Sequence, residues 1–246
     1  MMYRTSTLAE KYQPGTRINE YTVIKKLSET KSRISFLIEA LHHKYVLVII
    51  LDGKQKREME EDDSGLDLLA ALDHNGIPKW IDRIDFDGIS GYILEYIEGK
   101  TLEQIVTQDK YQFNLNEIHD ICQQLLDILS YLHRQNIVHR DINISNVILK
   151  NNELHLVNFE HAHYIDDSKY KMQDDFSCLG ELLLQLYCSS CQKKKFGRKP
   201  WGNRWQNELD MNKRELRLLR KLKGLDEQYQ SVKEIQKDFS AIMTQQ

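Results

Sequence analysis

The sequence predicts an α+β fold of two lobes, in which a small β-rich lobe precedes a larger α-helical lobe. In the first part of the chain, apolar residues alternate with polar ones or form short β-branched runs, as in strands. Further along, apolar residues recur at helical spacing, as in amphipathic helices. Between the two patterns, Glu98-Gly99-Lys100 has the composition of a linker. The 246 residues, 41% of them hydrophobic, are enough to form a core in each lobe.

The expected elements follow from these patterns in chain order. The predicted strands are Tyr21–Leu27, Arg33–Ala40, Tyr45–Leu51, Trp80–Phe86, Tyr92–Ile97, Ile137-Val138, Val147–Leu149 and Leu154–Val157. A polar stretch, residues 54–65, precedes a short helix around Leu66 to Leu72. The predicted longer helices are 118–132, Phe176–Tyr187, Arg214–Leu222 and Val232–Ile242. We therefore expect an N-terminal extension at 1–18, the first lobe at 19–97 and the second at 98–246.

Composition excludes several classes of protein. The longest apolar run, Tyr45–Leu51, is far shorter than the roughly 20 residues of a membrane-spanning helix. The first residues lack the apolar segment of a signal peptide, so we expect a cytoplasmic protein. Four scattered cysteines do not form a disulfide framework. The C-x-x-C pair Cys188 and Cys191 has no second pair of metal ligands, so we expect no metal site.

One short motif carries recognisable chemistry. Residues His139 to Asn146, HRDINISN, have the form H-R-D-x-x-x-x-N, which resembles the catalytic loop of the protein kinase superfamily. Other segments resemble that family in the same order along the chain: LDHNGIPKW (72–80), YILEYIEG (92–99), LHLVNF (154–159), DFSCLGELL (175–183) and QYQSVKEI (228–235). The bacterial Ser/Thr branch is the most similar. The resemblance implies a bilobal protein-kinase-like fold.

The resemblance also assigns roles to particular residues. Asp141 matches the catalytic carboxylate, and Asn146 matches a metal ligand; here we expect both to persist mainly as hydrogen-bonding residues that shape the loop. The matching nucleotide-cleft positions are Leu27, Arg33, Val46, Val48, Leu94, Tyr96, Ile148 and Asn158. Leu94 falls at the gatekeeper position. The structural spine and its anchor match Leu69, His139, Phe159 and Asp175.

The first lobe departs from the family pattern where nucleotide phosphates would bind. The glycine-rich loop matches LSETKSRIS (27–35), in which Ser28, Thr30 and Arg33 replace glycines that let the backbone approach phosphate. Val48 stands at the position of the phosphate-binding lysine. Gly65 stands at the position of that lysine's glutamate partner, and the nearby Glu61 would have no cation to pair with.

The second lobe departs at its metal and substrate positions. Asn158-Phe159-Glu160 replaces D-F-G, so a neutral amide stands where a carboxylate holds Mg²⁺. Asn143 occupies the position of a lysine that contacts the γ-phosphate. Only 17 positions separate Asn158 from Asp175 (175 − 158), and no A-P-E occurs in this short activation segment. The arginine that pairs with that motif in the family is replaced by Gln228.

These losses predict a catalytically inactive pseudokinase that needs no cofactor and acts as a regulatory or scaffolding module for a protein partner. A second hypothesis keeps phosphotransfer, with Asp141 as base and Arg33 as a relocated phosphate-binding cation. Under that hypothesis the chain is a residual Ser/Thr kinase or a small-molecule phosphotransferase. A related alternative is weak ATP binding without normal Mg²⁺ coordination.

A third hypothesis rests on charge. The formal net charge is −3, yet residues 193–223 contain twelve Lys/Arg and three acids, a net +9 that leaves −12 for the remainder. Such a block is able to bind nucleic acid, an anionic membrane surface or an acidic protein, although many charge runs are simply solvated. Trp201 and Trp205 within it are expected to pack against the second lobe. The residues of this candidate face are Lys193, Lys194, Lys195, Arg198, Lys199, Lys213, Arg217 and Arg220.

Overall fold

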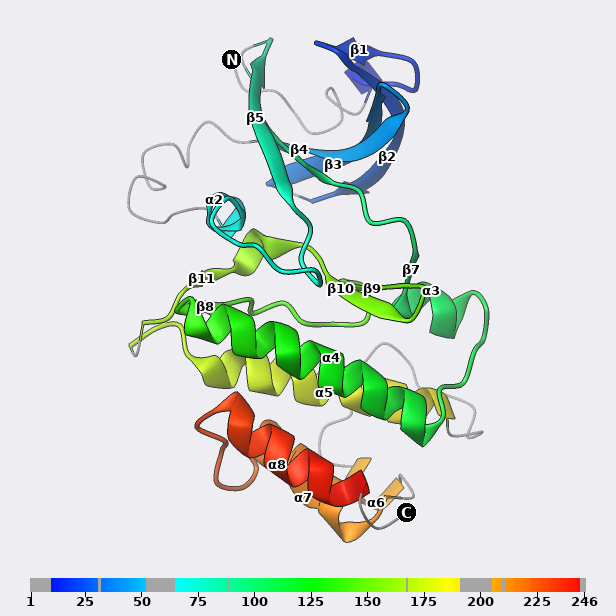
Figure 1. The fold of residues 1–246 in the computed structure, drawn as a ribbon. Coiled ribbons are helices and arrows are strands. Elements are labelled where there is room, and N and C mark those ends of the chain that lie inside the picture. Colours follow the sequence, from blue (N-terminus) through cyan, green and yellow to red (C-terminus); the bar gives the residue numbers. More distant parts are fainter. Residues whose placement is uncertain are drawn as a thin grey trace. The chain divides into compact units, whose positions relative to one another are not determined.

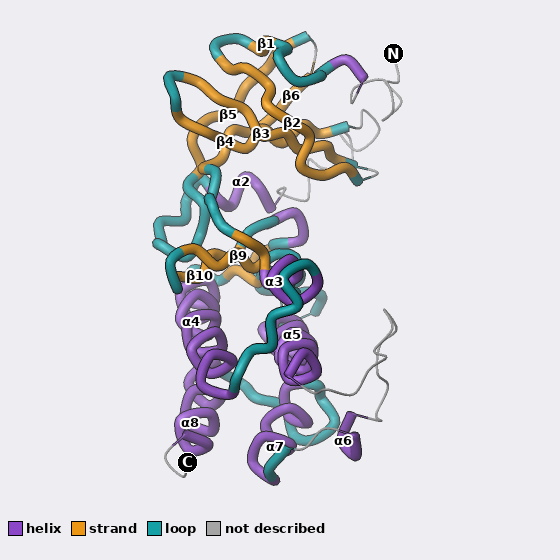
Figure 2. The backbone as a smooth tube through the Cα atoms, turned by 90° about the vertical axis from the view of Figure 1, so that its right-hand side faces the viewer, coloured by secondary structure: helices purple, strands orange, loops and turns teal. Residues whose placement is uncertain are grey.

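The computed structural model describes residues 10–30, 32–51, 65–87, 89–166, 168–190, 205–208 and 211–243. The chain divides into two compact units, residues 1–98 and 99–246. Strands dominate the first unit and helices the second, as Figure 2 shows. The α+β prediction is therefore confirmed.

A curled antiparallel sheet makes up most of the described part of the first unit (Figure 1). Its strand order is β1-β2-β3-β4-β6-β5. The strands are β1 (Arg17–Ile18), β2 (Tyr21–Glu29), β3 (Arg33–Ala40), β4 (His43–Ile50), β5 (Trp80–Phe86) and β6 (Ile89–Glu95). The helix expected after the polar stretch is the short α2 (Gly65–Leu69).

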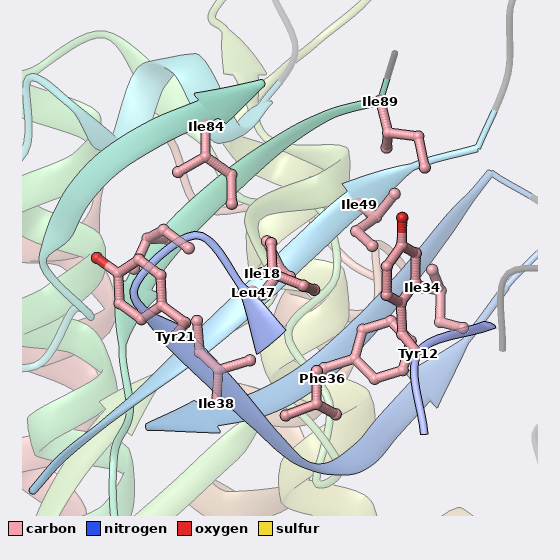
Figure 3. Packing of buried hydrophobic residues seen from close by; sticks show 12 residues of the cluster. Tyr12, Ile18, Tyr21, Ile34, Phe36, Ile38, Leu47, Ile49, Ile84 and Ile89 are labelled. Carbon is pink, nitrogen blue, oxygen red and sulfur yellow. The ribbon is translucent and has the colours of Figure 1, made fainter. Parts of the chain in front are cut away.

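One face of this sheet forms the core of the first unit. Leu47 and Ile49 of β4 are fully buried, whereas Val46 and Val48 point to the opposite face and are half-buried. This alternation follows from the two-residue repeat of a strand. Tyr12 and Ile18, which fall in the expected N-terminal extension, are each 3% exposed and join the same core. Figure 3 shows Tyr12 packed beside Phe36.

Helices form most of the described part of the second unit. They are α3 (Leu102–Thr107), α4 (Leu115–Arg134), α5 (Met172–Ser190), α6 (Trp205–Glu208), α7 (Lys213–Leu222) and α8 (Val232–Met243). Helix α4 packs on α5 and α8, and α7 packs on α5 and α8 (Figure 1). Trp205 is 1% exposed.

Local sequence sets where these helices begin. At the start of α4, the Asn114 side chain accepts a hydrogen bond from the Glu117 amide, and the Glu117 carboxylate accepts one from the Asn114 amide. Asn212 and Glu215 form the same capping box at the start of α7. Each box satisfies backbone N–H groups that have no partner inside the helix.

Short strands complete the described fold of the second unit. They are β7 (Lys100–Thr101), β8 (Ile137–Val138), β9 (Val147–Lys150), β10 (Glu153–Leu156) and β11 (His163–Tyr164). The order β10-β9-β7 forms one small sheet, and β11 pairs with β8 in another. The 3-10 turn η2 (Phe159–His161) lies between β10 and β11. The strands predicted at Ile137-Val138, Val147–Leu149 and Leu154–Val157 correspond to β8, β9 and β10, and β7 begins at Lys100, the last residue of the segment expected as a linker.

Candidate active site

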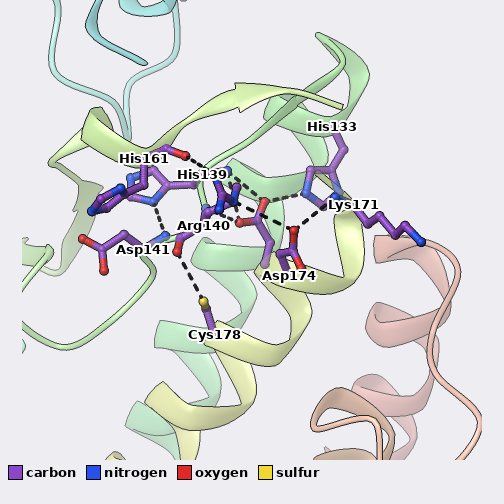
Figure 4. A network of polar contacts seen from close by, with 9 residues as sticks. His133, His139, Arg140, Asp141, His161, Lys171, Asp174 and Cys178 are labelled. Carbon is purple, nitrogen blue, oxygen red and sulfur yellow. Dashed lines mark hydrogen bonds and ion pairs between the residues drawn. The ribbon is translucent and has the colours of Figure 1, made fainter. Parts of the chain in front are cut away.

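A buried carboxylate anchors the loop that contains the H-R-D motif. Asp175 in the first turn of α5 is fully buried and accepts hydrogen bonds from the amides of His139 (3.1 Å) and Arg140 (2.7 Å). The Nε2 of His133, near the end of α4, lies 2.8 Å from the same carboxylate (Figure 4). Because these donors satisfy the buried charge, Asp175 fixes the backbone immediately before Asp141.

His139 connects this loop to the strand that precedes Asn158. The Asp141 amide donates to its Nδ1 (3.2 Å), so Nδ1 carries no proton. The proton is therefore on Nε2, which donates to the Val157 carbonyl at 3.2 Å. Burial lowers the pKa of His139 and keeps the ring neutral. The ring also meets the Phe159 ring edge to face, with centroids 4.6 Å apart.

Three asparagine amides surround the Asp141 carboxylate. Asn143 Nδ2 donates to one carboxylate oxygen at 2.8 Å. Asn146 Nδ2 and Asn158 Nδ2 donate to the other oxygen, at 2.7 and 3.1 Å. Asn143 and Asn146 also bond the Asp141 carbonyl, at 3.2 and 2.9 Å. We call this arrangement of Asp141, Asn143, Asn146 and Asn158 the amide cage.

Backbone conformation brings the members of the cage together. Asn158 has φ +68° and Arg140 has φ +65°, both in the left-handed region that non-glycine residues rarely adopt. Asparagine adopts this conformation more readily than most non-glycine residues, and here the Asn158 amide reaches Asp141 and Asn146. At Arg140, the bond to Asp175 holds the turn. These unusual backbone conformations lie where the H-R-D loop meets the turn at Asn158, and such conformations are typical of functional sites.

The amide cage does not fit the Mg²⁺ chemistry that its motif implies. Magnesium prefers anionic oxygen ligands. Asn158 is neutral, and its Nδ2 faces Asp141 and also lies 3.4 Å from Asn146 Oδ1. Within the described residues, no group of three or more His, Cys, Asp or Glu side chains is arranged to hold a metal ion.

In the first unit, Val48, which stands at the position of the family's phosphate-binding lysine, lies beside a tyrosine. Val48 on β4 is directly opposite Tyr92 on β6, so the two side chains share one face of the sheet. The Tyr92 ring is 4% exposed, and its hydroxyl donates to an Asp67 carboxylate oxygen of α2 at 2.8 Å. The hydrogen bond joins α2 to the sheet where the family uses an ion pair.

The segment that matches the glycine-rich loop is a hairpin turn closed by side chains. Thr30 Oγ1 accepts hydrogen bonds from the Arg33 amide at 3.1 Å and the Ser32 amide at 3.4 Å. The hydroxyls of Ser28 and Ser35 lie 2.6 Å apart across the two strands. These bonds need the side chains that glycines lack.

The remaining predicted cleft and spine positions lie as follows. Leu27 is 40% exposed on β2, and Leu94 on β6 is buried. Arg33, Val46, Tyr96 and Ile148 are half-buried. Leu69 of α2 and Phe159 are each 1% exposed.

Three of the six described Lys/Arg residues in the basic block pair with carboxylates. Arg220 Nη2 and Nε bond Asp226 at 2.7 and 2.9 Å, and its Nη1 bonds Gln206. Lys221 pairs with Asp238 and Lys223 with Glu181. Lys213 and Arg217 are exposed on α7. Lys193, Lys194, Lys195, Arg198, Lys199 and Trp201 lie outside the described residues, as do Glu61 and Cys191.

Comparisons with known proteins agree with this arrangement. A family model described as the protein kinase domain matches residues 50–178, slightly more than half of the chain. A Bacillus subtilis protein named "Probable serine/threonine-protein kinase YbdM" is 33% identical over 203 residues, which cover 80% of this chain and 78% of that protein. The chain belongs to the protein kinase family.

Two further comparisons define the extent of the kinase similarity. The kinase domain of Mycobacterium tuberculosis PknI, solved as a mutant, superposes with a TM-score of 0.68 at 18% identity, covering 93% of this chain and 98% of that one. This likeness shows the bilobal kinase fold. Serine/threonine-protein kinase 10 of Danio rerio is 30% identical over 100 residues, 41% of this chain and 10% of that protein.

Sequence reasoning missed part of the kinase-family site. It singled out Asn143 and Asn158 as two separate losses, although both amides bond Asp141. The signal was that both replacements are asparagine, a residue able to donate to a carboxylate. It also missed Tyr92 and Asp67, because their contact depends on how strand and helix meet.

Among the described residues, no helix combines the length and apolar character needed to span a membrane.

Proposed function

We propose that this chain is a catalytically inactive member of the protein kinase family that acts as a regulatory or scaffolding module. The observation that carries the proposal is the amide cage. Both oxygens of Asp141 accept hydrogen bonds from asparagine side chains. A general base needs a free lone pair within reach of the substrate proton. Here three amide donors take three of the roughly four acceptor positions of the carboxylate, which leaves little room for a substrate hydroxyl.

The phosphate-binding side supports the same proposal. Val48 supplies no cation for the α- and β-phosphates. The hairpin turn at Thr30 is closed by side-chain hydrogen bonds where the family uses glycines. The family model also begins its match at residue 50, after both features. Catalysis by positioning and electrostatics requires these parts together, so their joint replacement favours an inactive protein.

A protein partner fits the described surface better than a nucleic acid. Binding to phosphates would need several unpaired cations side by side. Instead Arg220, Lys221 and Lys223 each pair with a carboxylate. We also propose that the cationic residues between 193 and 199 contribute to partner binding. The proposed location is the cytoplasm.

Two assays on the purified chain test inactivity. The first measures the unfolding temperature with ATP and Mg²⁺, because a ligand stabilises by RT ln(1 + [L]/Kd). The second measures transfer of radiolabel from γ-labelled ATP to the chain itself and to a general protein substrate, with Mg²⁺ and then Mn²⁺. We expect no Mg²⁺-dependent thermal shift and no transfer.

Two variants give the assays their controls. Transfer by the wild-type chain that disappears in Asp141→Asn would overturn the proposal in favour of a residual kinase, which the names of the relatives favour. Loss of that transfer in Arg33→Ala as well would identify Arg33 as its phosphate-binding cation. Transfer that persists in Asp141→Asn comes from a contaminating kinase, so it leaves the wild-type chain inactive as proposed.

A further inference from the structure

The segment between Asn158 and α5 lies against the loop that precedes Asp141. In this segment, β11 pairs with β8, with His163 opposite Val138 and Tyr164 opposite Ile137. The next amide, of Ile165, donates to the Asn136 carbonyl at 2.7 Å. Asp166 and Tyr170 then form an antiparallel bridge, with N–O distances of 2.9 and 2.8 Å. The segment is therefore docked through its backbone as well as its side chains.

The arginine of the H-R-D motif reaches this segment with its whole side chain. The Arg140 guanidinium carbon lies 4.3 Å from the centre of the Tyr170 ring, over its face. Nη1 donates to the His161 carbonyl at 3.4 Å, and Nε lies 3.9 Å from an Asp174 oxygen. Figure 4 shows Arg140 between His161 and Asp174. Arg140 thus joins two points of the segment, His161 and Tyr170, and the first turn of α5 to the catalytic loop.

Tyr170 is the centre of this arrangement. Its side chain is 9% exposed although it lies in a loop. The His163 ring stacks on the Tyr170 ring, with centroids 4.2 Å apart and planes 7° from parallel. The Lys169 ammonium lies 4.6 Å from the same ring centre. An electron-rich ring beside these cations is favourable because its quadrupole attracts positive charge.

We propose that Tyr170 is a built-in clamp that holds this segment in its docked conformation through Arg140 and His163, without any phosphate group. In kinases with long activation loops, such loops become ordered when a phosphorylated side chain pairs with arginine. Here an unmodified aromatic ring contacts the arginine. The clamp makes docking a permanent property of the fold, not one that a modification switches on. This inference does not depend on whether the chain transfers phosphate.

Hydrogen exchange of individual backbone amides tests the clamp. The reporters are the amides of Ile165, Asp166 and Tyr170, each of which donates a hydrogen bond in the docked segment. The Tyr170→Phe variant keeps the ring and removes only the hydroxyl, whereas Tyr170→Leu keeps an apolar side chain without a π face. We expect the leucine variant to speed exchange at the three reporters by about tenfold, and the phenylalanine variant to match the wild type.

An internal reference separates local release from unfolding of the whole unit. The Ile118 amide in α4 donates to Asn114 and lies in a different element, so its exchange should not change. Wild-type protection of the reporters in Tyr170→Leu would overturn the proposal. If that variant fails to fold, Arg140→Gln decides, because the Arg140 side chain is 31% exposed and its removal leaves little buried space. Unchanged reporters in Arg140→Gln would also overturn it.

The independence from phosphate is tested on the same protein. The chain is treated with a phosphatase, and its intact mass confirms that no phosphate remains. We expect the reporter amides to stay protected after this treatment. Protection that appears only in a phosphorylated sample would overturn the clamp. Because no nucleotide is added, none of these outcomes bears on the phosphotransfer assays.

Discussion

At the scale of single residues, the amide cage keeps the charge balance of the family's catalytic loop with different side chains. Relative to the family pattern, Asn143 replaces a cationic side chain and Asn158 replaces an anionic one. The two changes cancel in charge. Each new amide also donates a hydrogen bond to Asp141, at 2.8 and 3.1 Å. Asp141 is thus supported without the lysine and the metal that would otherwise neutralise it.

Replacing Asn158 with aspartate should destabilise the cage. The Asn158→Asp change removes the donor that lies 3.1 Å from Asp141 and places a second carboxylate beside the first. Loss of the bond together with like-charge repulsion should lower the free energy of unfolding by about 1–3 kcal/mol. Two adjacent carboxylates are suited to a hard dication. Millimolar Mg²⁺ should therefore restore part of the loss, measured as the unfolding temperature with and without the ion.

The matched control for that experiment is Asn158→Ala. Alanine removes the same donor but adds no charge, so its unfolding temperature should not respond to Mg²⁺. An equal Mg²⁺ response in the wild type and in Asn158→Asp would contradict our conclusion that the native residues do not fit the ion.

At the scale of elements, a strand and a helix are joined in a way that the sequence alone does not show. Tyr92 on β6 lies opposite Val48, and its hydroxyl bonds Asp67 on α2. In an active kinase, an ion pair joins the equivalent strand and helix and helps to hold the nucleotide. The neutral donor here provides only the joining contact. The position of α2 therefore rests on a bond that needs no nucleotide.

Removing the Tyr92 hydroxyl should weaken this contact selectively. The Tyr92→Phe change preserves the buried ring but leaves Asp67 without this donor, so we expect a loss of about 1–2 kcal/mol in the free energy of unfolding. Urea denaturation measures the loss. Asp67→Asn keeps an acceptor oxygen and should lose less. Equal stability of Tyr92→Phe and wild type would show that the bond does not hold α2 in place.

Close packing beside β7 leads to a second prediction for elements. A Cβ atom at Gly99 would lie 2.6 Å from the Leu149 carbonyl oxygen and 2.7 Å from Ile148 Cγ2. Because the first of these atoms belongs to the backbone, β9 would have to shift. We expect Gly99→Ala to lower the free energy of unfolding by about 1–3 kcal/mol, measured by urea denaturation. The control Lys100→Ala removes an exposed ion pair with Asp109 and should cost less than about 1 kcal/mol.

The elements also show how far sequence reasoning extends. Long runs such as β3 (Arg33–Ala40) and β5 (Trp80–Phe86) were predicted with their bounds, because a full run of side chains displays the strand period. Two-residue strands such as β7 and β11 are too short to show the alternation of buried and exposed side chains that identifies a strand. Their pairing depends on neighbours distant in sequence. The H-R-D loop was recognised from spacing, but the cage and the Tyr170 clamp depend on three-dimensional contacts.

At the scale of the whole molecule, buried neutral histidines link stability to pH. His119 on α4 is 7% exposed and stacks on Phe239 of α8, with ring centroids 4.1 Å apart. Its Nε2 is buried and has no hydrogen-bond partner among the described residues. Burial lowers the pKa of His119 below its ordinary value of 6.5, against the opposing effect of Asp120. Burial lowers the pKa of His139 as well.

The direction of the pH effect follows from these lowered pKa values. As the pH falls below about 6.5, the unfolded chain binds protons at both histidines before the folded chain does, so the free energy of unfolding decreases. Above that pH neither of these two histidines changes the free energy of unfolding with pH. The exposed carboxylates Asp87, Asp166 and Asp226 have lowered pKa values, so their stabilising contribution is present above about pH 4 and disappears only in stronger acid. The interval from about pH 5 to 7 therefore isolates the histidines.

Substitution of His119 should reduce the slope of stability against pH in that interval. His119→Phe preserves an aromatic stack on Phe239 but removes the titrating group, so the contribution of His119 is lost. Each such group contributes at most about 1.4 kcal/mol per pH unit. Urea denaturation at several pH values measures the slope for both proteins. Asn116→Ala, which changes an exposed residue of the same helix and removes no titrating group, serves as the control and should keep the wild-type slope. Parallel curves for wild type and His119→Phe would show that His119 accepts a proton equally well in the folded and unfolded chain, and that α8 packs on α4 without excluding its charged form.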